Sequence, residues 1–220
     1  MLKKIRDDIT ETKKKERRET FNFYVLILCL LFFIVLIIHL NLFVLMNIEV
    51  SGKSMESTLQ SGDNLIVIRN AKIERGDIII INKNTHKTAE TDYYIIKRVI
   101  GVGGDKVEIK TDGKVYVNGE QLDESYLDDG QVTYIYDFFH HEYLPGEISI
   151  NLKDDEIFYL GDNRKNSLDA RVNGPCKQSD VIGVVSDFSV RHRKGLTKVF
   201  NFMRSIPDGL SDFFGCGSKD

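Results

Sequence analysis

The 220-residue sequence has little of what several classes of protein require. Three cysteines are too few for a disulfide scaffold. With 30 basic and 33 acidic residues the net charge is −3, which excludes the chain-wide positive surface of nucleic-acid-binding proteins. There is no internal repeat, and a hydrophobic content of 42% excludes disorder of the whole chain. The length allows one ordinary domain with an appendage.

Residues 21–46 lack any charged side chain, and 23–38 is an unbroken apolar run. About 20 apolar residues span the bilayer core of about 30 Å, and a buried core helix of this length would have a polar face. The run exceeds the roughly 7–15 apolar residues of a signal peptide, and no small-x-small motif follows it. The sequence therefore predicts an uncleaved transmembrane anchor in the lipid bilayer.

The charges beside this anchor predict its orientation. Residues 1–20 hold eight basic side chains, whereas Lys53 is the one basic residue among the first twenty after the anchor. The positive-inside rule then makes 1–20 a cytoplasmic tail and 47–220 an extracytoplasmic domain of a single-pass cell-membrane protein. Eight residue steps from Met46 to Ser54 reach about 26–29 Å when extended, so Ser54 is expected close to the membrane.

The domain after the anchor has the pattern of a mainly β fold. Runs rich in β-branched and aromatic residues alternate with Gly, Asp and Asn, and Asp112-Gly113 predicts a hairpin turn. Alternating strands and helices are absent, which excludes a doubly wound parallel sheet. Strands are expected at 64–69, 77–82, 93–102, 106–109, 114–117, 156–160 and 181–190.

Two segments depart from this pattern. Residues 120–155 are acidic and irregular, typical of an inserted cap, which we place at about 111–155. After residue 194, apolar residues recur at helical spacing and predict a helix packed on the domain or lying on a membrane surface. These residues are Leu196, Val199, Phe200, Met203 and Ile206.

Adjacent basic residues interrupt the strand at 93–102. Apolar side chains on both of its faces indicate burial, which makes Lys97 and Arg98 costly unless they are paired or neutral. They could instead extend to solvent from a strand edge. An acidic partner from a later segment, Asp162 or Asp169, could neutralise Arg98. Burial without a partner would push Lys97 toward the neutral amine, which is a general base.

A base of this kind needs a nucleophile, and Ser54 is the candidate. It follows a glycine-containing turn and precedes an apolar methionine, a common setting for an exposed hydroxyl. Lysine can remove the proton of serine as histidine does in catalytic triads. The pair His140-His141 lies in the irregular segment without metal-ligand spacing, so no metal or other cofactor is expected.

Four short blocks together resemble the bacterial type I signal peptidases of the Ser/Lys kind. They follow the anchor in order: S-M-E-S-T-L from Ser54, R-G-D from Arg75 before an apolar strand, I-K-R-V-I-G from Ile96, and G-D-N-R-K-N-S-L-D-A-R from Gly161. The resemblance covers residues 22–102 and 156–190. It implies a serine endopeptidase that removes signal peptides from secreted preproteins through an acyl-enzyme.

The resemblance also assigns roles and a fold. Ser54 would be the nucleophile and Lys97 the base, with substrate bound as an added strand in an antiparallel β core that carries a cap. Ser167 would orient the lysine amine, while Asp162–Arg98 and Asp169–Arg171 would brace the site. Pockets for small residues at −1 and −3 would be lined by Val50, Met55, Leu59, Ile95 and Ile96.

The sequence also departs from the family pattern. Ser57 and Gly103 stand where proline is usual, and Ala170 replaces a common serine. Gly52 occupies a position where some relatives have a serine that donates to the oxyanion. The Ser54 N–H would therefore need a second donor that the sequence does not identify.

Two other interpretations stay open. A sortase-like transpeptidase is also anchored and β-rich, but it needs a reactive cysteine such as Cys176 or Cys216. A tethered β scaffold without activity would leave the four blocks unexplained. A disulfide between the two cysteines is possible on an oxidising side of the membrane.

Overall fold

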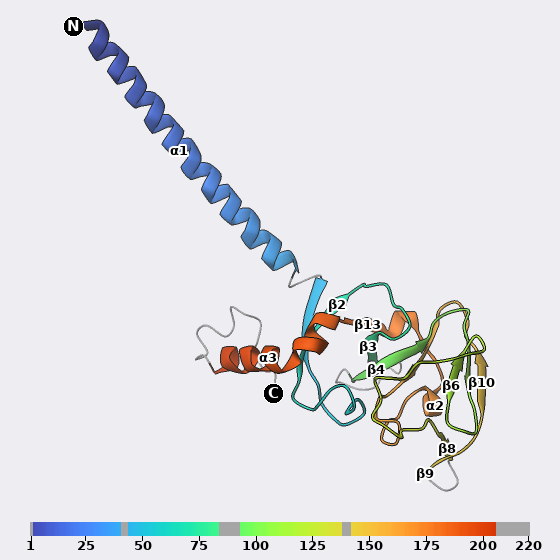
Figure 1. Cartoon of the computed structure of the whole chain (residues 1–220). Coiled ribbons are helices and arrows are strands. Elements are labelled where there is room, and N and C mark those ends of the chain that lie inside the picture. The colour runs from blue at the N-terminus through green and yellow to red at the C-terminus, as the bar shows by residue number, and fades with distance from the viewer. Residues whose placement is uncertain (1, 41–43, 84–92, 138–141, 206–220) are drawn as a thin grey trace. The chain divides into compact units, whose positions relative to one another are not determined.

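In the computed structural model, residues 2–40, 44–83, 93–137 and 142–205 are described. The chain divides into two compact units, 1–44 and 45–220. The first unit contains α1 (Leu2–His39), a continuous helix drawn in blue (Figure 1). Among the described residues, Lys13–His39 is the one stretch long and apolar enough to cross a membrane, and its apolar window is not buried by the protein. An apolar helix is therefore present where the sequence predicts the anchor.

The C-terminal end of the predicted anchor is wrong. Leu45 and Met46 belong to β1 (Leu45–Glu49), which pairs antiparallel with β2 (Asn64–Arg69). Met46 packs against the core of the second unit, whereas alternate residues of β1 are exposed. The apolar residues at the start of β1 directly follow the apolar run of the helix in the sequence. Hydrophobicity alone therefore does not show where the helix ends and the strand, with its alternating exposure, begins.

The main sheet of the second unit has seven strands in the order β1-β2-β13-β3-β4-β11-β12, and every described pair is antiparallel. The mainly β prediction is confirmed, and predicted strands match observed ones within one or two residues except at 181–190. The other strands of this sheet are β3 (Ile78–Asn82), β4 (Tyr94–Gly101), β11 (Glu156–Leu160), β12 (Cys176–Lys177) and β13 (Val181–Val185).

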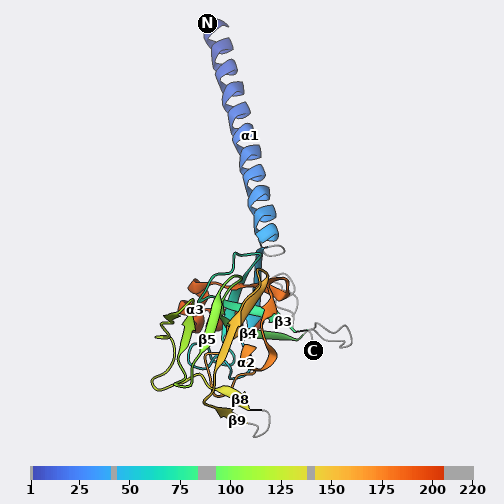
Figure 2. The same ribbon diagram turned by 90° about the vertical axis from the view of Figure 1, so that its right-hand side faces the viewer.

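A second sheet begins just before the predicted cap. Its order is β10-β5-β6-β7, and Gly113 at φ +78° lies in the predicted turn between β5 and β6. Figures 1 and 2 show this sheet beside the larger one, with a two-stranded hairpin at its lower end. The bounds are β5 (Lys106–Ile109), β6 (Val115–Val117), β7 (Glu120–Gln121), β10 (Ile148–Asn151), and, for the hairpin, β8 (Ile135–Asp137) and β9 (Glu142–Leu144).

The strand predicted at 181–190 ends at Val185, and α3 (Asp187–Arg204) begins two residues later. The alternation Phe188-Ser189-Val190 imitates a strand, yet these residues form the first turn of a helix in which Asp187 suits the positive helix N-terminus. The predicted C-terminal helix therefore starts earlier than expected; its last predicted residue, Ile206, lies outside the described residues. Two short elements complete the unit, α2 (Ala170–Asn173) and the 3₁₀ turn η2 (Gln178–Asp180).

Buried apolar residues form two clusters. The larger cluster joins both sheets: Ile79 and Tyr159 come from the seven-stranded sheet, and Val107 and Val117 come from the four-stranded sheet. The smaller lies beneath the loop between β1 and β2 and includes Leu65. Because each cluster supports one side of the same region, the loop with Ser54 and the strand with Lys97 rest on packed core.

Candidate active site

Ser54 lies in a closed loop between β1 and β2. Gly52 has φ +92°, a left-handed conformation that glycine adopts without strain. The ends of the loop are joined because the Val50 N–H donates to the Asp63 carbonyl at 2.8 Å, and the Gly62 N–H donates to the Val50 carbonyl at 2.8 Å. The backbone on both sides of Ser54 is therefore fixed by the fold.

Two apolar side chains hold this loop in the core. Met55 is 1% exposed and Leu59 fully buried, and the Leu59 N–H donates to the Met55 carbonyl at 2.7 Å. This single helical turn directs both side chains to the same side. The sequence predicts Met55 and Leu59 in the substrate pocket, but the structure places them in the smaller core cluster.

Lys97 on β4 extends to the serine. Its side chain is 3% exposed, and Nζ lies 2.7 Å from Ser54 Oγ and donates to the Ile96 carbonyl at 2.9 Å. Burial lowers the pKa of Lys97 from 10.5 to about 8, although the carboxylates of Asp169 and Asp162 oppose this effect. The neutral amine is thus accessible at mildly alkaline pH, as the sequence predicts for a desolvated lysine.

The neighbouring Arg98 forms the predicted pair with Asp162. Its Nε and one terminal nitrogen bind the two oxygens of that carboxylate at 2.9 and 2.7 Å, a bidentate and nearly buried contact. The other terminal nitrogen donates to the Gly76 carbonyl at 2.8 Å. Thr58 donates to the same carboxylate at 2.5 Å, so Asp162 ties β4 to the serine loop.

Asn163 and Gly161 are site residues that sequence reasoning missed. The Asn163 N–H donates to the Ser54 carbonyl at 3.0 Å, and its amide donates to the Lys53 carbonyl at 3.0 Å. A Cβ on Gly161 would lie 2.1 Å from Ser167 Oγ and 2.5 Å from the Ser54 carbonyl oxygen, so only glycine fits there. Both residues lie in the fourth sequence block, and this was the one feature of the sequence that could have pointed to them.

The second predicted pair also forms. Two of the three side-chain nitrogens of Arg171, Nε and one terminal nitrogen, donate to the two oxygens of Asp169 at 2.8 Å each, and both side chains are buried. Asp169 in turn accepts from the Gly161 N–H at 3.0 Å and caps α2. Ser167 is buried beside Gly161. Its predicted bond to the Lys97 amine stays a prediction.

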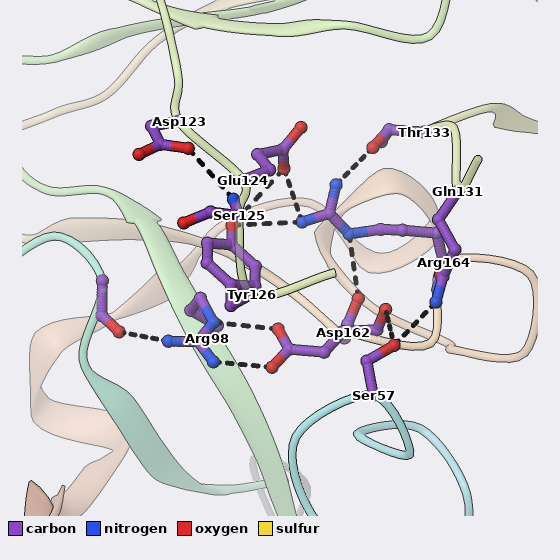
Figure 3. Close-up of polar contacts among 12 residues, drawn as sticks. Ser57, Arg98, Asp123, Glu124, Ser125, Tyr126, Gln131, Thr133, Asp162 and Arg164 are labelled. Carbon is purple, nitrogen blue, oxygen red and sulfur yellow. Dashed lines mark hydrogen bonds and ion pairs between the residues drawn. The ribbon is translucent and has the colours of Figure 1, made fainter. Parts of the chain in front are cut away.

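Arg164 organises a further network that was not predicted (Figure 3). It is 1% exposed, pairs with Glu124 at 2.6 Å, and donates to the Gly161 carbonyl at 3.0 Å and to the hydroxyl of Thr133. The Tyr126 ring covers the Arg98 guanidinium at 3.9 Å from its centroid. Segment 123–133 therefore packs over the ion pair that braces the site.

The same segment reaches the serine loop. Gln131 accepts from the Arg164 N–H at 3.1 Å and donates to Ser57 Oγ at 2.6 Å. Ser57 also donates to Asp128 at 3.1 Å. The Ser57 hydroxyl thus connects the serine loop with segment 123–133 (Figure 3).

A groove of about 400 Å³ runs along β1 toward β4. Among its lining residues are three of the five predicted substrate contacts, Val50, Ile95 and Ile96. The carbonyl of Ile96, one of these lining residues, accepts from Lys97 Nζ at 2.9 Å. The remaining lining residues are Met46, Asn47, Ile48, Glu49, Ser51, Ile80 and Tyr94.

Cys176 is a poor candidate for a nucleophile. Its side chain is buried, and burial raises the pKa of its thiol to about 12, which disfavours the reactive thiolate. The other candidate, Cys216, lies outside the described residues. Within the part of the chain that is described, no three His, Cys, Asp or Glu side chains are grouped as metal ligands.

Comparison with known proteins agrees with the sequence blocks. Residues 21–189 match the family described as signal peptidase, peptidase S26. The chain belongs to this family. Signal peptidase I of Bacillus caldolyticus is 37% identical over 185 residues, which cover 79% of this chain and 92% of that protein. Signal peptidase I P of Bacillus subtilis subsp. natto is 32% identical, over 77% of this chain and 90% of that protein.

Two further relatives belong to the signal peptidases. Signal peptidase IB of Staphylococcus aureus is 36% identical over 66% of this chain and 77% of that protein. A solved structure of a signal peptidase I from Enterococcus faecalis V583 has 31% identity and a TM-score of 0.39, and covers 53% of this chain and 98% of that one. The chain is accordingly a serine protease, a hydrolase of the signal peptidase I class.

Proposed function

We propose that the protein removes signal peptides from secreted preproteins, with Ser54 as nucleophile and Lys97 as general base. The observation that carries the proposal is the 2.7 Å contact between Lys97 Nζ and Ser54 Oγ, formed by a buried amine with a pKa lowered to about 8. A base with a pKa near the working pH combines a populated neutral form with useful basicity.

The reaction is acyl transfer in two steps. Neutral Lys97 takes the hydroxyl proton as Ser54 Oγ attacks the scissile carbonyl carbon, and the Ser54 N–H donates to the oxyanion. The C–N bond then breaks, the lysine proton goes to the departing amine, and the signal peptide remains as an ester on Ser54. A water then attacks this ester and gives a proton to Lys97. As the ester bond breaks, Lys97 passes this proton to Ser54 Oγ.

The substrate is proposed to bind as an extended strand beside the groove. In the described residues β1 pairs on one side, with β2, and β11 pairs with the part of β4 that begins at Arg98. Two strand edges near the groove are therefore available for main-chain hydrogen bonds. Small residues at −1 and −3 would fit against Val50, Ile95 and Ile96, because these apolar side chains leave a shallow site.

The supporting residues hold the reactive side chains in position and do not contact the bond that breaks. Asp162–Arg98 and Asp169–Arg171 hold the segment 161–164 against the serine loop and β4. In this proposal Ser167 orients the Lys97 amine. The apolar helix α1 anchors the chain once in the cell membrane, with the basic N-terminus in the cytoplasm and the peptidase domain outside.

The direct test uses the full chain in detergent with a preprotein that carries Ala-x-Ala before its cleavage site. Mass spectrometry should find a new N-terminus immediately after that motif. Ser54→Ala and Lys97→Ala should abolish the product, whereas Cys176→Ala and Cys216→Ala should leave most of the activity. Turnover by Ser54→Ala, or its loss on thiol alkylation of the unmodified chain, would refute the proposal.

A further inference from the structure

The helix α3 has one face that is fixed against the sheet. Ser189 is fully buried, and Thr197 Oγ1 accepts from the Asn64 N–H of β2 at 2.9 Å. At the end of the helix Arg204 pairs with Glu49 of β1 at 2.6 Å. Figure 1 shows α3 next to β2. These contacts define the inner face, so the opposite face is turned away from the domain.

The opposite face is apolar. Phe188 is 55% exposed, Val199 54% and Phe202 69%. In the stretch after the kink at His192, Val199 and Phe202 fall across from Thr197 and Arg204 at 100° per residue. Phe188 also stacks on His192, with ring centroids 4.4 Å apart. Val199 and Phe202 lie three residues apart in the part of the helix after His192. A row of large apolar side chains on an outer helix face indicates a contact surface.

Basic side chains accompany this row. The helix holds five lysines and arginines and a single acidic residue, Asp187. Arg193 and Arg204 pair with carboxylates of the domain, but in the described part of the chain Arg191, Lys194 and Lys198 have no carboxylate partner. Where the helix is kinked at His192, a hollow of about 400 Å³ is lined by residues 191–195. Arg191 and Lys194 give this hollow a positive charge.

We propose that the outer face of α3 docks on an anionic membrane surface. The apolar row would enter the boundary between headgroups and acyl chains, and Arg191, Lys194 and Lys198 would bind lipid phosphates, as basic amphipathic helices do. A second copy fits less well, because it would place these cations against one another. This inference rests on the proposed anchoring of α1 in the membrane.

Chain length makes the contact accessible. Five residues separate the end of α1 at His39 from the start of β1 at Leu45. They span about 20 Å at most, so β1 starts near the membrane. Within the second unit, β2 pairs with β1 and α3 packs on β2. Docking would give the catalytic domain a second membrane contact.

The experiment uses the full chain, one copy per nanodisc, in phosphatidylcholine or in equal parts phosphatidylcholine and phosphatidylglycerol. An environment-sensitive fluorophore is attached at Phe202→Cys in a chain that also carries Cys29→Ser, Cys176→Ala and Cys216→Ser. The matched control carries the fluorophore at Asp112→Cys, an exposed turn of the other sheet. Iodide reports access from water, and lipids with a quencher in the upper acyl chain report insertion.

We expect the fluorophore at position 202 to be shielded from iodide and quenched by lipid in the anionic discs, with no such change at position 112. Each cation near an anionic surface shifts an equilibrium about fivefold, so the triple variant Arg191→Gln, Lys194→Gln, Lys198→Gln should lose about a hundredfold in docking. Peptide cleavage by this variant in detergent should be unchanged.

Three results would overturn the inference. The fluorophore could be equally open to iodide in anionic discs and in detergent. It could be shielded equally in both lipids and in the triple variant, which would exclude anion recognition. It could become shielded in detergent as the chain concentration rises, which would identify a second copy as the partner. Failure of the proposed function is separate, since it would appear as absent cleavage in detergent whatever the fluorescence.

Discussion

In the proposed mechanism, the side chain of Lys97 connects catalysis to pH. Because burial lowers its pKa to about 8, the neutral amine becomes the main form above that value. We expect kcat/KM for a soluble peptide to rise about tenfold per pH unit below 8 and to level off above it. A pH profile of the full chain in detergent measures this. A profile that is flat between pH 6 and 9 would contradict lysine as the base.

The same burial has a cost for stability. With folded and unfolded pKa values of about 8 and 10.5, the unfolded state binds more protons between them, so stability rises with pH through that window. Below pH 8 the penalty is fully present, at about 3 kcal/mol. Lys97→Met should therefore be inactive yet at least as stable as the parent at pH 7.

Thermal unfolding followed by circular dichroism at several pH values tests this prediction. The advantage of Lys97→Met should shrink between pH 8 and 10, because the parent no longer carries a buried charge. Lys165→Met, at an exposed position of segment 161–169, is the control and should not change stability at any pH. A Lys97→Met protein that is clearly less stable at pH 7 would mean that the lysine serves as a charged structural residue.

Sequence reasoning succeeded with residues whose surroundings are set by their own strand. The burial of Lys97 follows from the apolar neighbours on both faces of β4, and the Arg98 pair follows from the cost of an unpaired charge. It did not foresee the burial of Met55 and Leu59, where one helical turn inside a loop rotates both side chains into the core; their place in the substrate pocket stays a prediction. The residues Asn163 and Gln131 act through contacts distant in sequence, which no local pattern reports.

At the scale of elements, the segment 123–133 braces the serine loop. Gln131→Ala removes the 2.6 Å bond to Ser57 and the acceptor of the Arg164 N–H. The variant should lose about 1–2 kcal/mol of stability. It should also lower kcat by up to about tenfold with KM nearly unchanged, because the loop shifts but the groove residues do not. Steady-state kinetics with a peptide substrate measures both parameters.

The control for this variant is Lys165→Ala, which removes an exposed side chain from the neighbouring segment. Ser57→Ala should behave as Gln131→Ala does, and the double variant should lose little more than either one, since both break the same bond. Additive losses in kcat would show that the two side chains act independently. An unchanged kcat in both single variants would remove this segment from the catalytic machinery.

Element boundaries were hardest to predict where apolar residues fit either period. The alternation after Val181 suits a strand, but tertiary packing of Val190 against the core favours the helix α3. At Leu45 and Met46 the error is opposite, because a long apolar run hides a strand that pairs with β2. Both errors lie where an element joins its neighbour within a few residues.

For the whole molecule, the division at residue 44 separates the proposed membrane anchor from the proposed catalytic domain. We expect residues 45–220, which include all of β1, to cleave a soluble peptide as fast as the full chain does. The fragment should be slower on a preprotein inserted in liposomes, because tethering raises the effective concentration of enzyme at the surface. Equal rates in liposomes would contradict a role for the anchor. A fragment that begins at residue 47 should be less stable, since it lacks part of β1.

The open strand edges beside the groove also bear on product release. In the proposed binding mode, a substrate that fills this gap would be held by main-chain bonds, each worth about 1 kcal/mol. Cleavage divides that one strand into two pieces, and each piece keeps only its own share of the bonds. We therefore expect the mature protein to leave once the C–N bond breaks, and the signal peptide to follow when water frees it from the proposed ester on Ser54. On this proposal the chemical step itself weakens binding, and turnover would need no separate opening motion.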